Sequence, residues 1–153
     1  MAYEIKRFPY AGTVDADGHI LEPPDLWENY LEERYRSRAL RIQTDDDGFE
    51  YLEIDQQPSA RTRKGSLGLL GAMGDDDLRP RPDRRYADNM PFGSSDPAER
   101  LDLMVQENLE HCLLYPTIGL LWEAELKDPE LSLAYCRANN RWIADFCRDS
   151  GGR

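Results

Sequence analysis

Hydrophobic and polar positions along the chain first predict a short strand followed by an amphipathic helix. Residues 12–17 form a β-branched run that favours a strand, and Gly18 marks its end. Prolines then indicate a loop, after which apolar positions recur at helical spacing over residues 25–35. Because proline suits the first turn of a helix, Pro24 indicates where this helix begins.

Two alternating runs, at residues 40–44 and 49–54, predict a pair of strands. The residues between them are acidic and end in Gly48, which is typical of a β-hairpin over residues 40–55. Periodicity then disappears over residues 56–95, which hold four prolines and five glycines. Long stretches of this kind are mobile surface loops or lids that order over a substrate or partner, and both interpretations stay open.

Residues 96–150 carry the clearest pattern. Asp96 is followed by a proline and, three positions on, a glutamate, which is the capping-box start of a helix. An apolar run at residues 112–115 predicts a buried parallel strand. Asp128 and Pro129 repeat the cap-and-proline opening for the longest helix, which extends to about Asp149. The order strand, helix, strand, helix predicts an α/β fold with a parallel sheet.

The length and the net charge of the chain exclude several classes of protein. The chain has 153 residues and a formal net charge of −11, and we expect it to form one domain over residues 1–153. It is too short for a complete (β/α)₈ barrel, which needs roughly 200 to 400 residues. The acidic excess argues against nucleic-acid and anionic-membrane partners. Its longest apolar stretches are only a few residues long, so we expect no transmembrane segment.

Three cysteines, Cys112, Cys136 and Cys147, are odd in number and lack Cys-x-x-Cys spacing. Cys136 and Cys147 fall in one predicted helix, where eleven residues separate them by about 16 Å. A disulfide cannot bridge that distance. We therefore expect buried free thiols and a reducing, cytoplasmic setting.

Four candidates for chemistry follow one another at the end of the first predicted strand: Asp15, Asp17, His19 and Glu22. Alternate residues of a strand share a face, so we expect Asp15, Asp17 and His19 to project the same way. Carboxylate oxygens and imidazole nitrogens together bind Zn²⁺ and related ions, and α/β folds place their chemistry at the carboxyl ends of strands. The same residue types also serve as turn and capping residues, so the motif alone leaves both interpretations open.

Residues 14–27, Val-Asp-Ala-Asp-Gly-His-Ile-Leu-Glu-Pro-Pro-Asp-Leu-Trp, resemble the N-terminal signature of the amidohydrolase-related family. This family comprises metal-dependent TIM-barrel hydrolases and includes aminocarboxymuconate-semialdehyde decarboxylase and related aromatic-acid decarboxylases. Residues 96–104, 113–117 and 139–142 are similar to later stretches of the same family. The resemblance extends over most of residues 12–150.

The resemblance implies the first two β/α units of a (β/α)₈ TIM barrel that is incomplete, with a β-hairpin and a long loop inserted. The implied parts are a first strand with the metal motif at residues 12–35, a hairpin at 40–55, an irregular insertion at 56–95 and a helix–strand–helix unit at 96–150. The later barrel strands, which carry the family's remaining ligands and its catalytic aspartate, are expected to be absent from this sequence.

The family's first strand usually offers His-x-His, and here Asp17 stands in place of the first histidine, with His19 as the second. The resemblance therefore implies Asp17 and His19 as ligands of a divalent metal. Zn²⁺ is the first expectation and Mn²⁺ the second, because a carboxylate shifts the preference toward harder ions. His111, the other histidine, begins the second strand at the end away from the motif, and we expect it to be structural.

These inferences predict the N-terminal part of an amidohydrolase-like, metal-dependent hydrolase or decarboxylase. Its full-length relatives act on small carboxylated or aromatic substrates, and we expect the isolated chain to be inactive because a catalytic zinc site needs about three protein ligands. Unpaired strand edges favour a homo-oligomer. The alternative is a small, non-catalytic α/β binding or interaction module, which sedimentation and dye binding would distinguish from a barrel fragment.

Overall fold

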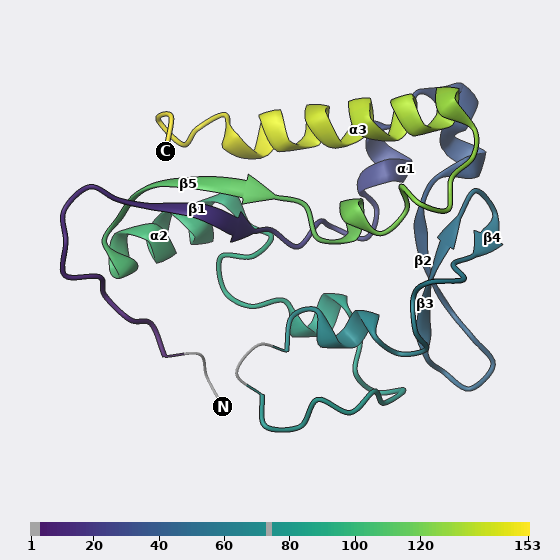
Figure 1. The fold of residues 1–153 in the computed structure, drawn as a ribbon, viewed down its shortest axis with the longest axis horizontal. Coiled ribbons are helices and arrows are strands. Elements are labelled where there is room, and N and C mark those ends of the chain that lie inside the picture. Colours follow the sequence, from purple (N-terminus) through teal and green to yellow (C-terminus); the bar gives the residue numbers. More distant parts are fainter. Residues whose placement is uncertain (1–3, 73–74) are drawn as a thin grey trace.

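The computed structural model describes residues 4–72 and 75–153, which form two small sheets and the helices that pack around them (Figure 1). One sheet pairs β1 (Thr13–His19) with β5 (Leu109–Tyr115) in parallel, as the α/β pattern predicts. The described residues form no closed barrel. The fold is therefore mixed α/β, with the two parallel strands side by side in space although about ninety residues separate them in the sequence.

The predicted β-hairpin is confirmed. Strands β2 (Arg41–Thr44) and β3 (Glu50–Ile54) pair antiparallel, and the two-residue strand β4 (Gln57–Pro58) adds to β3. The turn is closed by the Asp45 side chain, whose Oδ1 accepts hydrogen bonds from the backbone N–H groups of Asp47 and Phe49.

Both capped helices are confirmed as well. The first, α2 (Pro97–Glu107), begins where the Asp96 carboxylate accepts hydrogen bonds from two backbone N–H groups. The second, α3 (Pro129–Cys147), begins at Asp128 in the same way. Each aspartate satisfies donors that a helix start otherwise leaves without partners.

The prediction of a single helix over residues 25–35 is wrong. The chain instead forms a short helix α1 (Leu26–Tyr30) and a 3-10 helix (Glu33–Arg38), because Leu31 and Glu32 adopt extended backbone angles. This break places the Glu32 carboxylate 2.8 Å from the guanidinium of Arg137 in α3. Tertiary packing here overrides local helix propensity.

Part of the core lies between α1 and α3. The ring of Tyr135 makes an edge contact with Trp122 at 5.2 Å between centroids and a tilted contact with Trp27 at 6.1 Å. Trp142, the third tryptophan, is buried against Phe146. All three tryptophans are therefore core residues, which is the usual place for aromatic side chains.

Apart from β4 and two short 3-10 helices (Leu67–Leu69 and Ala87–Asn89), the described residues of the 56–95 segment are irregular, but the surface-loop interpretation is wrong for its buried residues. Leu67 and Tyr86 belong to the core, and the Arg84 side chain is buried in an ion pair with Asp75 at 2.6 Å. Tyr86 also donates its hydroxyl to the backbone oxygen of Glu22, 2.9 Å away. The segment is thus anchored to the loop that follows β1.

The expectation of buried thiols is wrong for two of the three cysteines. Cys136 and Cys147 are exposed and Cys112 is half-buried, and all three are free. The apolar stripe of α3 directs residues such as Ala134 and Ala138 inward, which leaves Cys136 on the solvent side. Within the described residues, no helix is long and apolar enough to cross a membrane.

Candidate metal centre

The carboxyl ends of β1 and β5 lie next to each other. His19 is the register partner of Tyr115, and the centroids of their rings are 6.4 Å apart. Parallel strands bring their carboxyl ends to one edge of a sheet, and this edge is where α/β folds place their chemistry. The predicted metal motif therefore lies at the appropriate edge.

A β-bulge divides the motif. Asp15 pairs with Cys112 and Gly18 pairs with Leu114. Between these two pairs β1 advances by three residues, whereas β5 advances by two. The extra residue in β1 changes which side chains share a face. As a result Asp15 and Gly18 both face the helix side, where Asp15 Oδ2 accepts a weak hydrogen bond from Cys112 Sγ at 3.5 Å.

The expectation that Asp15 shares a face with Asp17 and His19 is therefore wrong. Asp17 and His19 are exposed and flank Gly18, which is buried. Alternation along the strand then places both side chains on the open face of the sheet, away from the helices. The bulge keeps Asp17 and His19 on one face of the sheet and places Asp15 on the other, so Asp15 is no longer a candidate ligand.

Apolar side chains accompany them on this open face. Val14, Leu113 and Tyr115 are 51%, 56% and 44% exposed. Along β5, Leu113 and Tyr115 alternate with the half-buried Cys112 and Leu114, which line a cleft beside the helices. The strand predicted to be buried is therefore covered on one face alone in the described chain.

Glu22 is removed from the candidate ligands by its own contacts. Its side chain is fully buried, and its carboxylate accepts hydrogen bonds from the backbone N–H groups of Thr117, Ile118 and Gly119 at 3.1, 3.0 and 2.8 Å. Burial raises the pKa of Glu22, and these N–H donors act in the opposite direction. Glu22 thus joins the loop after β1 to the loop after β5.

Two residues that the sequence analysis did not consider contact His19. Thr117 Oγ1 lies 3.2 Å from the imidazole Nδ1, and the Arg100 guanidinium donates to the His19 backbone oxygen at 2.7 Å. Thr117 directly follows Pro116, which marks the end of the second strand. The rule that chemistry gathers at the carboxyl ends of parallel strands would have pointed to Thr117.

His111 lies away from this edge, as predicted. It is the register partner of Val14, near the other end of the strand pair, and it is exposed. Its structural role stays a prediction.

The donor chemistry of Asp17 and His19 fits a divalent ion, but the pair is incomplete. One carboxylate and one imidazole suit Zn²⁺ or Mn²⁺. In the part of the chain that the structure describes, no group of three or more His, Cys, Asp or Glu side chains could hold a metal. A site with three protein ligands therefore requires donors beyond these two.

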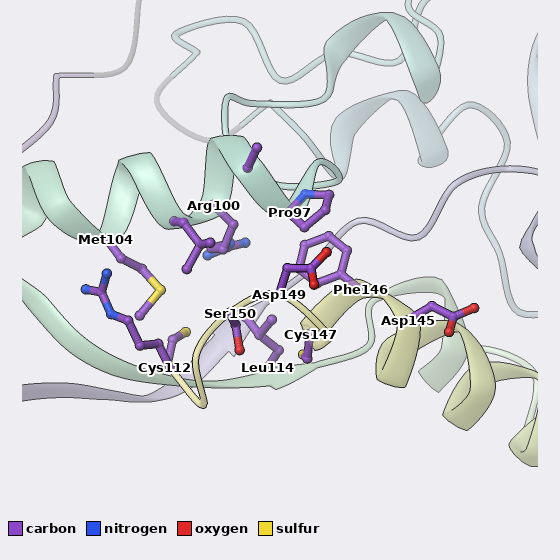
Figure 2. Close-up of a pocket in the computed structure, with 13 residues that line it drawn as sticks. Pro97, Arg100, Met104, Cys112, Leu114, Asp145, Phe146, Cys147, Asp149 and Ser150 are labelled. Carbon is purple, nitrogen blue, oxygen red and sulfur yellow. The ribbon is translucent and has the colours of Figure 1, made fainter.

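A separate cleft of about 190 Å³ lies on the helix side of the sheet (Figure 2). Figure 2 shows Met104 from α2, Leu114 from β5 and Phe146 from α3 around it. Cys112 also lines the cleft, and burial with the nearby Asp15 raises the pKa of its thiol to about 11. Neither Asp17 nor His19 lines this cleft, so it is distinct from the candidate metal centre.

The arrangement of elements is similar to that of a known enzyme. The crystal structure of an amidohydrolase from Mycobacterium avium subsp. paratuberculosis K-10 matches with a TM-score of 0.63 and 22% sequence identity. The match covers 88% of this chain and 38% of that structure, so the chain spans less than half of its relative's length. No family model matches the sequence, and no curated protein does so either. The chain therefore has the fold of part of an amidohydrolase.

Proposed function

We propose that this chain forms the N-terminal part of a metal-dependent hydrolase or decarboxylase with an amidohydrolase fold. The observation that carries the proposal is the shared position of Asp17 and His19 on the open face at the carboxyl end of β1. The resemblance of residues 14–27 supports small carboxylated or aromatic molecules as substrates. It also supports the decarboxylase branch of the family as the nearest group.

In this proposal the chain supplies two β/α units of a (β/α)₈ barrel. The first unit consists of β1 and α2, with residues 40–55 and 56–95 inserted between them, and the second consists of β5 and α3. The open face of β1 and β5 then faces the barrel interior, which in such barrels is filled by side chains of the other strands. The exposed apolar residues of that face are consistent with this placement.

Asp17 would hold the metal through a carboxylate oxygen and His19 through a ring nitrogen. Zn²⁺ is the first candidate and Mn²⁺ the second. When bound, a divalent ion supplies Lewis-acid polarisation of a substrate oxygen or activates a water molecule. The chain's own contribution is to present these two donors side by side, with the His19 backbone held by Arg100.

The non-catalytic alternative rests on the same open face. Val14, Leu113 and Tyr115 form an exposed apolar surface that a second copy of the chain or another protein would cover. A compact monomer in sedimentation that binds no hydrophobic dye would favour a self-sufficient module.

We also propose a reducing, cytoplasmic setting on the basis of the three free cysteines.

Metal binding tests the proposal directly. Calorimetric titration of the metal-free chain with Zn²⁺ or Mn²⁺ should show one site, and both Asp17→Asn and His19→Gln should weaken it by about 10-fold or more. His111→Gln is the matched control and should bind as the wild type does. Equal affinity in all variants would refute Asp17 and His19 as ligands. Turnover assays with added metal should detect no activity in the isolated chain, because the ligand set is incomplete.

A further inference from the structure

We propose that the cleft between α2, α3 and the strand pair β1–β5 binds a small carboxylate with an apolar body the size of a benzene ring, and that Arg100 pairs with its carboxylate group. The cleft lies on the helix side of the sheet, whereas Asp17 and His19 are not among the residues that line it. The inference therefore goes beyond the proposed function and does not depend on it.

The cleft is built from segments that the fold holds in place. Its lining residues come from α2, β5, α3 and the turns that follow α3 (Figure 2). Arg153 closes one side, because its backbone oxygen accepts a hydrogen bond from Cys112 N at 2.9 Å and its guanidinium donates to the backbone oxygen of Leu109 at 2.6 Å. The turns after α3 are thus attached to the edge of β5, which gives the cleft a defined shape.

Most of the side chains that line the cleft are apolar. Met104 and Phe146 are buried, and Leu101 and Leu114 are half-buried. An apolar cavity of roughly 150 Å³ is large enough to take up a benzene molecule. The cleft has a volume of about 190 Å³, so it has room for a body of that size with one small polar group attached.

Arg100 supplies the polar end of the cleft. Its guanidinium carries five N–H donors, and Nη2 donates to the backbone oxygen of His19 at 2.7 Å. Within residues 4–72 and 75–153, neither Nε nor Nη1 has an acceptor, Nε is buried, and no carboxylate forms an ion pair with this side chain. A guanidinium with unused donors favours a planar acceptor that carries a negative charge. A ligand carboxylate at Nη1 would supply that acceptor.

The other charged groups at the cleft are engaged elsewhere or lie at its rim. The carboxylate of Asp145 accepts a hydrogen bond from the Tyr30 hydroxyl at 3.0 Å and forms an ion pair with Arg148. The guanidinium of Arg153 donates to backbone oxygens of β5. Asp149 is exposed, so water screens its repulsion of an anion. The guanidinium on α2 therefore decides which charge the cleft accepts.

The experiment is a titration of the full, metal-free chain with benzoate, followed through the NMR signals of its methyl groups. We expect saturable shifts at Met104, Leu101 and Leu114, with a dissociation constant of about 1 mM or lower. The methyl groups of Val14, on the open face of the sheet, and of Leu52, in β3, should not shift. Shifts at Val14 in place of Met104, or no saturable shift at all, would overturn the proposal.

Benzamide and benzylammonium are the matched probes, because they keep the ring and change the charge. Both should bind about 10-fold more weakly than benzoate, since neither can form a charge-assisted pair with the guanidinium. Benzamide bound as tightly as benzoate would mean that the cleft selects an apolar ring without selecting a carboxylate, and it would overturn the proposal.

Two variants test the charge and the space separately. Arg100→Gln should weaken benzoate binding by about 10-fold and leave benzamide binding unchanged. Ala98→Trp leaves Arg100 in place and should abolish benzoate binding, because Ala98 is exposed at the cleft and the larger ring would fill it. Thermal denaturation checks that both variants are folded. Arg63→Gln, which removes an exposed guanidinium outside the cleft, is the control and should bind as the wild type does.

Asp149→Asn tests the sign of the ligand's charge from the opposite side. It removes a negative charge at the rim, so benzoate should bind about 2-fold more tightly and benzamide should be unaffected. Weaker benzoate binding in Asp149→Asn, or wild-type affinity in a folded Arg100→Gln or Ala98→Trp variant, would overturn the proposal.

Discussion

Asp15 turns its carboxylate toward the thiol of Cys112, 3.5 Å away, on the face of the sheet opposite to Asp17. Asp15 is the register partner of Cys112, and β1 carries one more residue than β5 between this pair and the next pair, Gly18 with Leu114. The bulge is therefore the feature that decides which donors of the Asp15–His19 stretch can act together.

Gly18→Ala should damage this bulge. A Cβ at position 18 would lie 2.4 Å from Cys112 Sγ and 2.8 Å from Asp15 Oδ2, so the strand pair must shift. We expect a loss of about 1 to 3 kcal/mol in the free energy of unfolding, measured by chemical denaturation. The double variant with Cys112→Ala should recover part of this loss, and a single Gly18→Ala variant as stable as the wild type would contradict the packing described.

Glu22→Ala should be among the most damaging single substitutions. It leaves two buried and one half-buried backbone N–H groups without their acceptor, and we expect a loss of about 3 kcal/mol or more in the free energy of unfolding. Glu123→Ala removes an exposed glutamate from the region after β5 and should change stability by less than about 0.5 kcal/mol. Equal losses in the free energy of unfolding for the two variants would contradict the stabilising role of the buried Glu22 carboxylate.

Tyr86→Phe tests how firmly the irregular segment is anchored. It removes the hydroxyl that bonds to Glu22 and leaves the buried backbone oxygen without this donor, so we expect a loss of about 1 to 2 kcal/mol. Tyr10→Phe is the matched control, since Tyr10 is 74% exposed. Thermal denaturation of both variants measures the difference, which should vanish if residues 56–95 do not pack on the core.

Asp128 should make stability depend on pH in the acid range. Its hydrogen bond with Arg38 lowers the pKa of this carboxyl from the ordinary value of 3.8. The stabilisation is therefore fully present above pH 3.8 and is lost as the pH falls through the folded-state pKa. Asp128→Asn keeps the helix cap but removes the charge, so its stability should converge on that of the wild type in strong acid.

Arg38→Met tests the same ion pair from the side of the guanidinium. Without the guanidinium, Asp128→Asn should have a smaller effect on stability near neutral pH, and the remaining effect comes from the hydrogen bonds of the carboxylate with the N–H groups of Glu130 and Leu131. A constant difference between the wild type and Asp128→Asn at all pH values would contradict the ion pair as its source.

The sequence predicted the elements whose signals are local. The hairpin at Asp45 and the helix starts at Asp96 and Asp128 depend on residues within a few positions, and all three are present. The helix over residues 25–35 was predicted wrongly because its break depends on a contact between Glu32 and α3, far along the chain.

The candidate site was predicted in part for the same reason. Asp17 and His19 could be found from an alternating pattern, but the bulge has no sequence signature, and Asp15 was therefore assigned to the wrong face. Glu22 was considered as a ligand because it follows Asp17 and His19 at the end of the first predicted strand. The donors that satisfy its buried carboxylate are backbone N–H groups about 95 residues away, which no local pattern reveals.

Paramagnetic broadening by Mn²⁺ tests the central claim most directly. Small amounts of Mn²⁺ added to the metal-free chain should selectively broaden the NMR signals of the His19 ring and the Asp17 amide, because a bound paramagnetic ion relaxes the nuclei nearest to it. The His111 ring should keep its line width, since it lies toward the other end of the strand pair. Equal broadening of both histidines, or broadening first at the exposed acidic turn Asp45–Asp47, would contradict a metal centre at Asp17 and His19.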